Sequence, residues 1–166
     1  MKILRSLFFI SIFLNAAASY GSQKLPDFSQ YTIKETDLMK EDPKPVDLSS
    51  HKEAKTYRTR LTEGAKAGAN FAGHYTVVSF GCGTQCQDNW VIDERTGKII
   101  DRFESVIGLK YELNSSLLII NPPDEEIRKA YEAHPEQPLL GEMTTSYKVL
   151  KNGKFHVVHK TRWVDL

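Results

Sequence analysis

The sequence predicts an α+β domain. Its sheet is an antiparallel meander of about six or seven strands, with one helix before it and one short helix inserted into it. Three observations lead to this prediction: β-rich runs recur at short spacing from residue 73 onward, tight Gly- or Asn-containing turns separate them, and a helical pattern precedes them. Strands joined by such short turns pair antiparallel, because a parallel connection needs a dozen or more residues.

The first residues have the pattern of an export signal. Lys2 and Arg5 precede an apolar run at residues 7–14, and residues 16–18 are alanines suited to cleavage. The run is too short to span a bilayer, which takes about 20 residues. We expect residues 1–18 to be a signal peptide, with Ser19 as an alternative cleavage position, and the mature protein to be periplasmic or extracellular.

The mature chain is predicted to be nearly neutral. Lys2 and Arg5 are two of the 22 Lys and Arg residues, which leaves 20 against 21 Asp and Glu. This balance gives no reason to expect nucleic acid or an anionic membrane as a partner. No later segment is apolar enough for membrane insertion after signal cleavage.

Residues 19–48 are predicted to form an extended polar arm, because prolines and charges interrupt them throughout. A weak alternation over residues 28–33 is a candidate edge strand. Residues 49–166 are then long enough for a single α+β domain.

A helix is predicted over residues 50–67. Ser50 and Glu53 have the spacing of a capping box, in which each side chain bonds the backbone N–H of the other residue. One narrow apolar face follows at helical spacing and consists of Ala54, Tyr57, Leu61 and Ala65. Basic residues cover the remaining surface, which is typical of a solvated face and also suits anion binding.

Residues 73–80 are apolar on both faces, which predicts a central strand covered on both sides. A short helix is predicted at residues 124–134, after two prolines and with acidic residues in its first turn. An Asn152-Gly153 turn joins the last two strands. The remaining strands are predicted, in order, at residues 90–93, 98–103, 106–113, 117–120, 145–150 and 155–164.

Cys82 and Cys86 are the two cysteines of the chain, and in an exported protein they predict one disulfide. Glycines beside Cys82 and strands on either side place the pair in a loop that folds back on itself. So short a ring stabilises the fold by only about 2 kcal/mol, and its role is to fix the shape of the loop.

Other chemistries remain open for these residues. A thiol oxidoreductase is one, although its cysteines are usually two residues apart at a helix N-terminus. Zinc bound by His74 with both cysteines lacks a visible fourth ligand, and a cysteine nucleophile with His74 as base needs a reduced thiol. His156 and His159, three apart on a predicted strand, are expected to face opposite ways. No cofactor or metal is predicted.

The stretch from residue 70 to residue 93 also carries polar and aromatic side chains that could hold a ligand or a partner. A Gly-rich turn can present successive N–H groups to an anion, and Trp90 with Tyr75 could form the floor of a small-molecule site. The structural alternative is that Asn70 caps a turn, that Trp90 belongs to the core and that His74 bonds locally. The candidate binding residues are Asn70, His74, Tyr75, Gln85, Gln87 and Trp90.

Four motifs occur together in this part of the chain: Thr56–Leu61, Asn-Phe-Ala-Gly-His-Tyr at residues 70–75, Gly-Cys-Gly-Thr-Gln-Cys-Gln at residues 81–87, and Asp93 with Thr-Gly-Lys at residues 96–98. On these motifs the chain resembles an uncharacterised family of small exported bacterial proteins. The resemblance covers residues 56–100. It implies export and no particular activity.

These observations predict an exported, non-enzymatic binding or interaction module that presents a disulfide-fixed, Gly-rich loop to a partner protein or a small envelope ligand. The alternative is a small exported enzyme. It would be a thiol oxidoreductase at Cys82 and Cys86, or a hydrolase that uses His74 with an acid such as Asp88.

Overall fold

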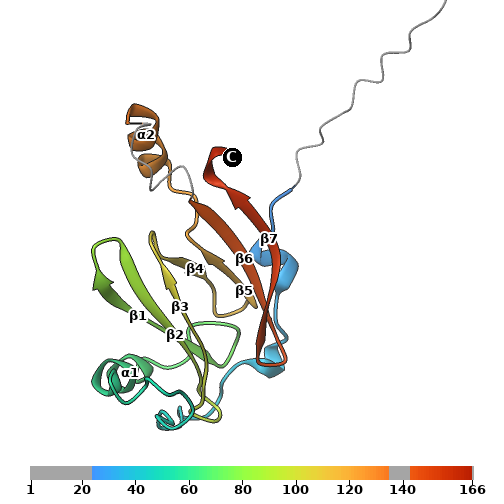
Figure 1. The fold of residues 1–166 in the computed structure, drawn as a ribbon. Coiled ribbons are helices and arrows are strands. Elements are labelled where there is room, and N and C mark those ends of the chain that lie inside the picture. Colours follow the sequence, from blue (N-terminus) through green and yellow to red (C-terminus); the bar gives the residue numbers. More distant parts are fainter. Residues whose placement is uncertain (1–23, 135–142, 166) are drawn as a thin grey trace, which may run out of the picture.

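The structure, a computed structural model, describes residues 24–134 and 143–165, so the predicted signal peptide lies outside the described residues. Figure 1 shows the fold. The helices are α1 (Arg58–Ala65) and α2 (Glu125–Ala133), with 3-10 turns at Phe28–Tyr31, Glu35–Asp37 and Trp163–Asp165. The strands are β1 (Tyr75–Gly83), β2 (Cys86–Asp93), β3 (Ile99–Ser105), β4 (Leu109–Tyr111), β5 (Leu117–Ile120), β6 (Thr144–Lys151) and β7 (Lys154–Arg162).

The described residues form seven strands in two antiparallel sheets, ordered β1-β2-β3 and β4-β5-β6-β7. The α+β class and the antiparallel pairing are therefore confirmed, but the single meander sheet is wrong. The chain changes sheet at residues 106–108, between β3 and β4. A sheet of seven strands would need both of its faces covered by other elements, whereas two sheets can cover one face of each other.

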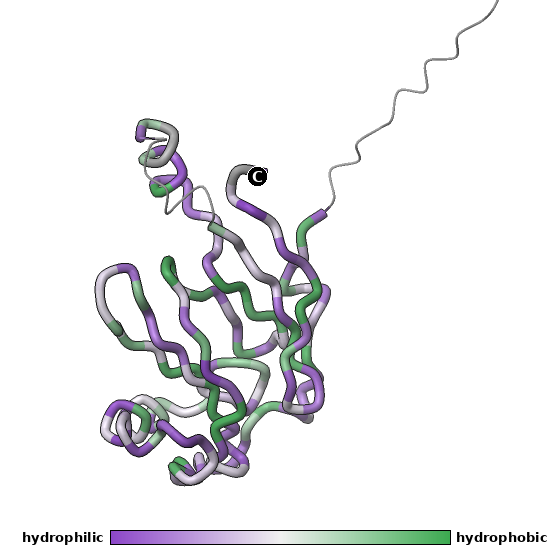
Figure 2. Tube along the Cα trace, in the orientation of Figure 1, coloured by the Kyte–Doolittle hydropathy of each residue, from purple (hydrophilic) through white to green (hydrophobic). Residues whose placement is uncertain are grey.

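The main core lies between the two sheets. Tyr75, Val77 and Val91 of the first sheet pack with Leu118 and Ile120 of the second in one buried cluster. Hydrophobic residues occur in the strands of both sheets, interspersed with hydrophilic ones (Figure 2). Strand β1 is covered on both faces, as expected, but it lies at the edge of its sheet, and β2 is the central strand.

Each outer face has its own cover. Helix α1 covers the outer face of the first sheet, where Leu61 packs with Val78 and Trp90. Gly64 makes this approach possible, because a Cβ at that position would lie 2.5 Å from Val78 Cγ1. The outer face of the second sheet is covered by the N-terminal arm through Leu25, Phe28 and Tyr31.

The predicted helix at residues 50–67 is shorter than expected, because residues 51–57 form turns before α1 begins. The prediction of a capping box is wrong. Ser50 Oγ accepts a hydrogen bond from the Ile99 N–H at 2.9 Å, and the Glu53 carboxylate pairs with Arg102. Both side chains thus join the helical segment to the first sheet. The predicted apolar face is nevertheless buried, as in Leu61 and Ala65.

Two predicted strands also differ. Residues 28–31 form a 3-10 turn that Asp27 caps, instead of an edge strand. Residues 106–113 pair only over Leu109–Tyr111, because the Asn121 side chain accepts the N–H groups of Val106 and Ile107 at 2.8 and 3.1 Å. The inserted helix and the Asn152-Gly153 hairpin are confirmed, and Asp124 caps α2 through the N–H groups of Glu126 and Ile127.

The arm also crosses the turn between β2 and β3, and backbone hydrogen bonds tie it to that turn and to the segment before β1. The N–H groups of Met39, Lys44 and Asp47 donate to the carbonyls of Gly73, Glu94 and Gly97 at 2.7, 2.9 and 2.8 Å, respectively. Among the described residues, no helix is both long enough and apolar enough to cross a membrane.

Candidate functional site

The β1–β2 hairpin organises the candidate site. Its strands stay paired from Tyr75 with Asp93 to Gly83 with Cys86, so Thr84 and Gln85 form a tight turn. Gln85 has φ 54° and Gly83 has φ 143°, a value that glycine adopts without a side-chain clash. The cysteines therefore lie within a strand ladder, and the predicted loop is in fact the end of a hairpin (Figure 1).

The predicted disulfide between Cys82 and Cys86 is present, with the two Cα atoms 5.1 Å apart. The strand register shifts between Gly81 and Gly83, so Cys82 is the extra residue of a β-bulge. The bond joins this bulge to the first residue of β2. The end of the hairpin is thus held both by covalent and by backbone bonds.

A hollow of about 460 Å³ lies beside the hairpin end. We call it the hairpin hollow. It offers backbone groups of glycines, one hydroxyl and two side-chain amides for hydrogen bonding. Among the residues that the structure describes, eight line the hollow, and none of these carries an ionisable group. They are Ser79, Phe80, Gly81, Gly83, Gln85, Cys86, Gln87 and Val106.

A buried polar network supports one side of the hollow. Asn89 is fully buried and accepts a hydrogen bond from Ser79 Oγ at 2.7 Å. Its amide nitrogen donates to the carbonyls of Gln87 and Phe103 and to Ser105 Oγ, at 3.0 to 3.2 Å. Such a satisfied buried amide fixes its neighbours, because any displacement would leave polar groups unpaired.

Asn121, which follows β5, fixes the far wall of the hollow. Its side chain binds the N–H groups of Val106 and Ile107, although its own backbone takes the strained value φ 50°. Next to this wall, a Cβ on Gly108 would lie 3.3 Å from Gln87 Oε1. The wall therefore depends on the second sheet, while the hairpin belongs to the first.

The outer face of the hairpin carries charge. The Arg60 guanidinium lies 4.7 Å from the centre of the Phe80 ring and donates to the Gly81 carbonyl at 3.4 Å. Farther from the end, Arg102 binds the buried Asp88 carboxylate through two hydrogen bonds of 2.8 and 2.9 Å. These hydrogen bonds raise the pKa of Arg102, which therefore remains charged.

The structure brings together two of the six predicted binding residues, Gln85 and Gln87. Trp90 is fully buried beneath α1, and Tyr75 packs on the opposite face of the sheet, so they do not form one floor. The Asn70 side chain binds the backbone N–H and carbonyl of Val77 at 2.8 and 3.2 Å. Asn70 thereby continues the hydrogen bonding along the edge of β1, so its side chain has a structural role.

His74 lies at the opposite end of β1 from the hollow. Its Nδ1 is 3.2 Å from the Asp37 carbonyl, and its Nε2 is 4.0 Å from Asp93 Oδ1. Burial lowers the pKa of His74, so the neutral form is favoured. Asp88, the acid suggested for a hydrolase, pairs with Phe80 of β1 and binds Arg102, five positions along β2 from Asp93.

The metal ligands considered from the sequence are not gathered. The described residues contain no group of three or more His, Cys, Asp or Glu side chains that could hold a metal ion. His156 and His159 face the same side of their sheet, contrary to expectation, because the register shifts between Tyr147 and Lys148 and Val158 bulges out. Their cross-strand partners, Val149 and Tyr147, both pack in the outer cluster.

Sequence reasoning missed Ser79, Val106 and the supporting Asn89. The alternation of β1 gave a signal for Ser79, because the face that holds Tyr75 and Val77 continues to Ser79 and Gly81. No sequence signal pointed to Val106, because its position depends on the hydrogen bond from its N–H to the side chain of Asn121, which follows β5 of the other sheet. Comparison with protein-family models, curated proteins and solved structures finds no match to this chain.

Proposed function

We propose that this protein is an exported binding module, and that the hairpin hollow recognises a neutral, hydrogen-bonding group of a small envelope ligand or a partner protein. The observation that carries the proposal is the chemistry of the lining. In the described part of the chain it combines glycine backbone, a serine hydroxyl and the amides of Gln85 and Gln87, without an ionisable side chain. Such groups suit amides or hydroxyls, and they offer no charge to pair with an ion.

The rigidity of the site supports the same proposal. The disulfide closes the hairpin, Asn89 holds its base and Asn121 holds the facing wall. A site fixed in advance loses less conformational entropy when a ligand binds, which favours affinity. Binding sites are commonly positioned by a rigid scaffold, and the fixed end of this hairpin is such a site.

The test is an amide chemical-shift titration of the mature, oxidised protein with a library of neutral amides and polyols. We expect shifts for some compounds to concentrate at Ser79, Gly81, Gln87 and Val106. The change Gln87→Ala should weaken binding of those compounds by about tenfold, because one good hydrogen bond is worth about 1 kcal/mol or more. Lys110→Ala, at an exposed position of β4, is the control.

Thermal unfolding of each variant shows whether the fold is intact. Loss of binding in Gln87→Ala with an unchanged unfolding temperature supports the proposal. Two results contradict the proposal. One is chemical-shift changes that spread over the whole surface, and the other is equal chemical-shift changes in Gln87→Ala and in the native protein. Trp90 is unsuitable as a test position because it is fully buried.

A further inference from the structure

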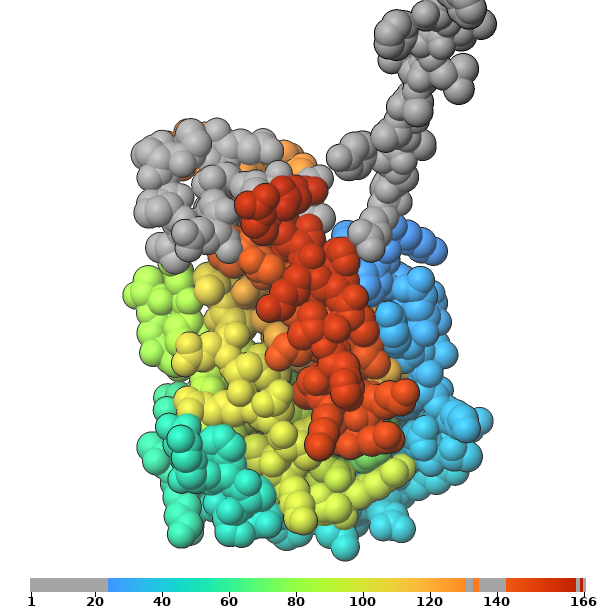
Figure 3. All heavy atoms as spheres, turned by 45° about the vertical axis from the view of Figure 1, so that its right-hand side comes forward, coloured from blue at the N-terminus to red at the C-terminus, as the bar shows by residue number. Residues whose placement is uncertain are grey.

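We propose that the outer edge of β7 is a docking site for an extended, acidic segment of another protein, which adds as a strand to the second sheet. Strand β7 is the last strand in that sheet, next to β6 alone. Its atoms form a ridge between β3 and the N-terminal arm (Figure 3). This surface is separate from the hairpin hollow and independent of the function proposed for it.

The direction of the backbone groups follows from the hairpin geometry. A two-residue turn at Asn152-Gly153 makes Lys151 and Lys154 the closing, hydrogen-bonded pair, so the N–H and carbonyl groups of Phe155 and Val157 point outward. Beyond the bulge at Val158, the bond from Trp163 N–H to the Met143 carbonyl fixes the alternation again. By that alternation the backbone of Lys160 also points outward.

These outward groups are available for pairing. In the described part of the chain, no hydrogen bond from outside the β6–β7 ladder reaches the backbone of Phe155, Val157 or Lys160. Val157 and Val158 are 52% and 42% exposed, an unusual exposure for two adjacent large apolar side chains. An added strand would satisfy the free backbone groups and cover part of this apolar surface.

The positive charge of the β6–β7 hairpin favours an acidic partner. Residues 144–162 contain no carboxylate but five cationic residues: Lys148, Lys151, Lys154, Lys160 and Arg162. Among the described residues, only Arg162 of this group has a carboxylate partner, Asp165 at 2.9 Å. By contrast, β2 and β3 carry four carboxylates and one arginine, and the mature chain as a whole is nearly neutral. Positive charge is therefore concentrated on this hairpin, and Lys154, Lys160 and Arg162 belong to β7 itself.

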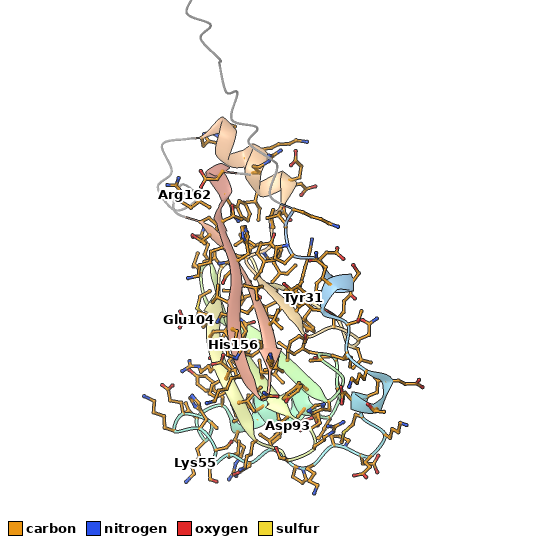
Figure 4. The ribbon with its side chains drawn as sticks, turned by 90° about the vertical axis from the view of Figure 1, so that its right-hand side faces the viewer. Tyr31, Lys55, Asp93, Glu104, His156 and Arg162 are labelled. Carbon is orange, nitrogen blue, oxygen red and sulfur yellow. A yellow bond between two sulfur atoms is a disulfide. The ribbon has the colours of Figure 1, made fainter. Side chains whose placement is uncertain are left out.

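This charge argues against a second copy of the chain as the occupant. Lysines on an edge strand prevent pairing with an identical edge, since like charges would face each other. An acidic strand would instead place carboxylates beside Lys154 and Lys160 and an apolar residue against Val157. The side chains of this strand, including the labelled His156, are seen along β7 in Figure 4. The bulge at Val158 divides the ladder into two short segments.

The probe is a capped peptide with the nine-residue length of β7, with glutamate on both faces and one valine at its centre, labelled at one end. Fluorescence anisotropy at low salt measures its affinity, and amide hydrogen exchange locates it. We expect saturable binding and slower exchange of the Phe155, Val157 and Lys160 amides. The double change Lys154→Glu and Lys160→Glu should weaken binding by about tenfold or more. Lys52→Glu with Lys55→Glu, at exposed positions near α1, should leave the affinity within about twofold.

Three outcomes overturn the proposal. The first is no saturable binding of the peptide at low salt. The second is equal weakening by both double variants, which indicates charge attraction without a specific site. The third is binding without protection of the three amides, together with equal binding to phosphatidylglycerol vesicles, which assigns the edge to an anionic lipid surface. Circular dichroism and thermal unfolding confirm that each variant is folded before it is compared.

Discussion

Arg102 of β3 holds the fully buried carboxylate of Asp88 on β2, with Nε and Nη2 donating to Oδ1 and Oδ2. The guanidinium also lies 4.9 Å from the centre of the Trp90 ring and pairs with Glu53 from the segment before α1. One arginine thus connects two strands to the helical cover of the first sheet. A buried carboxylate left without this partner would be strongly destabilising.

The change Arg102→Leu is therefore expected to lower the free energy of unfolding by about 3 kcal/mol, because it leaves the Asp88 charge buried and unpaired. The double change Asp88→Leu with Arg102→Leu removes both charges and should recover much of that loss. Urea unfolding of the single and double variants measures the difference. A double variant that is less stable than Arg102→Leu would show that the pair stabilises the fold in its own right.

The buried Glu94 is expected to make stability depend on pH. It is fully buried, and among the described residues neither carboxylate oxygen has a hydrogen-bond partner. Burial raises the pKa of Glu94 more than the nearby Thr76 hydroxyl lowers it, so the folded state binds this proton more tightly than the unfolded state does. The contribution is full below the unfolded-state pKa near 4.5 and is lost as pH rises toward the folded-state pKa.

The change Glu94→Gln removes this titration. Relative to the native protein, the variant should gain stability as pH rises from about 4.5 through the folded-state pKa of Glu94, as measured by urea unfolding at each pH. Burial of His74 lowers its pKa and acts in the opposite direction below pH 6.5, but it is present in both proteins and cancels in the difference. A difference that stays constant with pH contradicts the prediction.

The disulfide is expected to matter more for the hairpin end than for the whole fold. Replacing Cys82 and Cys86 together by serine should cost about 2 kcal/mol or less, because the ring is short. Amide exchange at Gly81, Gly83 and Gln87 should accelerate while that of the core strand β5 changes little. If the native disulfide has a reduction potential near those of known oxidoreductases instead of below about −300 mV, a thiol oxidoreductase becomes the better reading.

Gly97 is expected to be indispensable for attachment of the arm. It has φ 74°, and a Cβ at this position would lie 2.1 Å from the Pro45 carbonyl oxygen. Gly97→Ala should therefore lower the free energy of unfolding by about 2 to 4 kcal/mol and speed exchange of the Asp47 amide, which donates to Gly97. Gly81→Ala is the matched control, since its Cβ would meet open space and its φ is ordinary. Equal effects of the two changes would contradict this explanation.

Much of the fold can be predicted from local sequence. The Asn152-Gly153 turn requires positive φ at both residues, and both have it, at 52° and 70°. The helical spacing of Leu61 and Ala65 predicted their burial, even though the helix began later than its apparent cap suggested. At the candidate site, the disulfide and the amides of Gln85 and Gln87 were predicted, since the residues responsible are neighbours in the chain.

Tertiary structure decided the rest, because the interactions concerned join residues far apart in the chain. Ser50 and Glu53 match a capping box by spacing, but Ile99 and Arg102 offer them partners across the fold. Likewise, Asn121 holds Val106 from the other sheet and so forms a wall of the hollow. Sequence by itself determined the turns, the buried faces and the cross-link, which depend on local geometry. The division into two sheets, and hence the wall of the hollow at Val106, depends on which apolar faces cover one another.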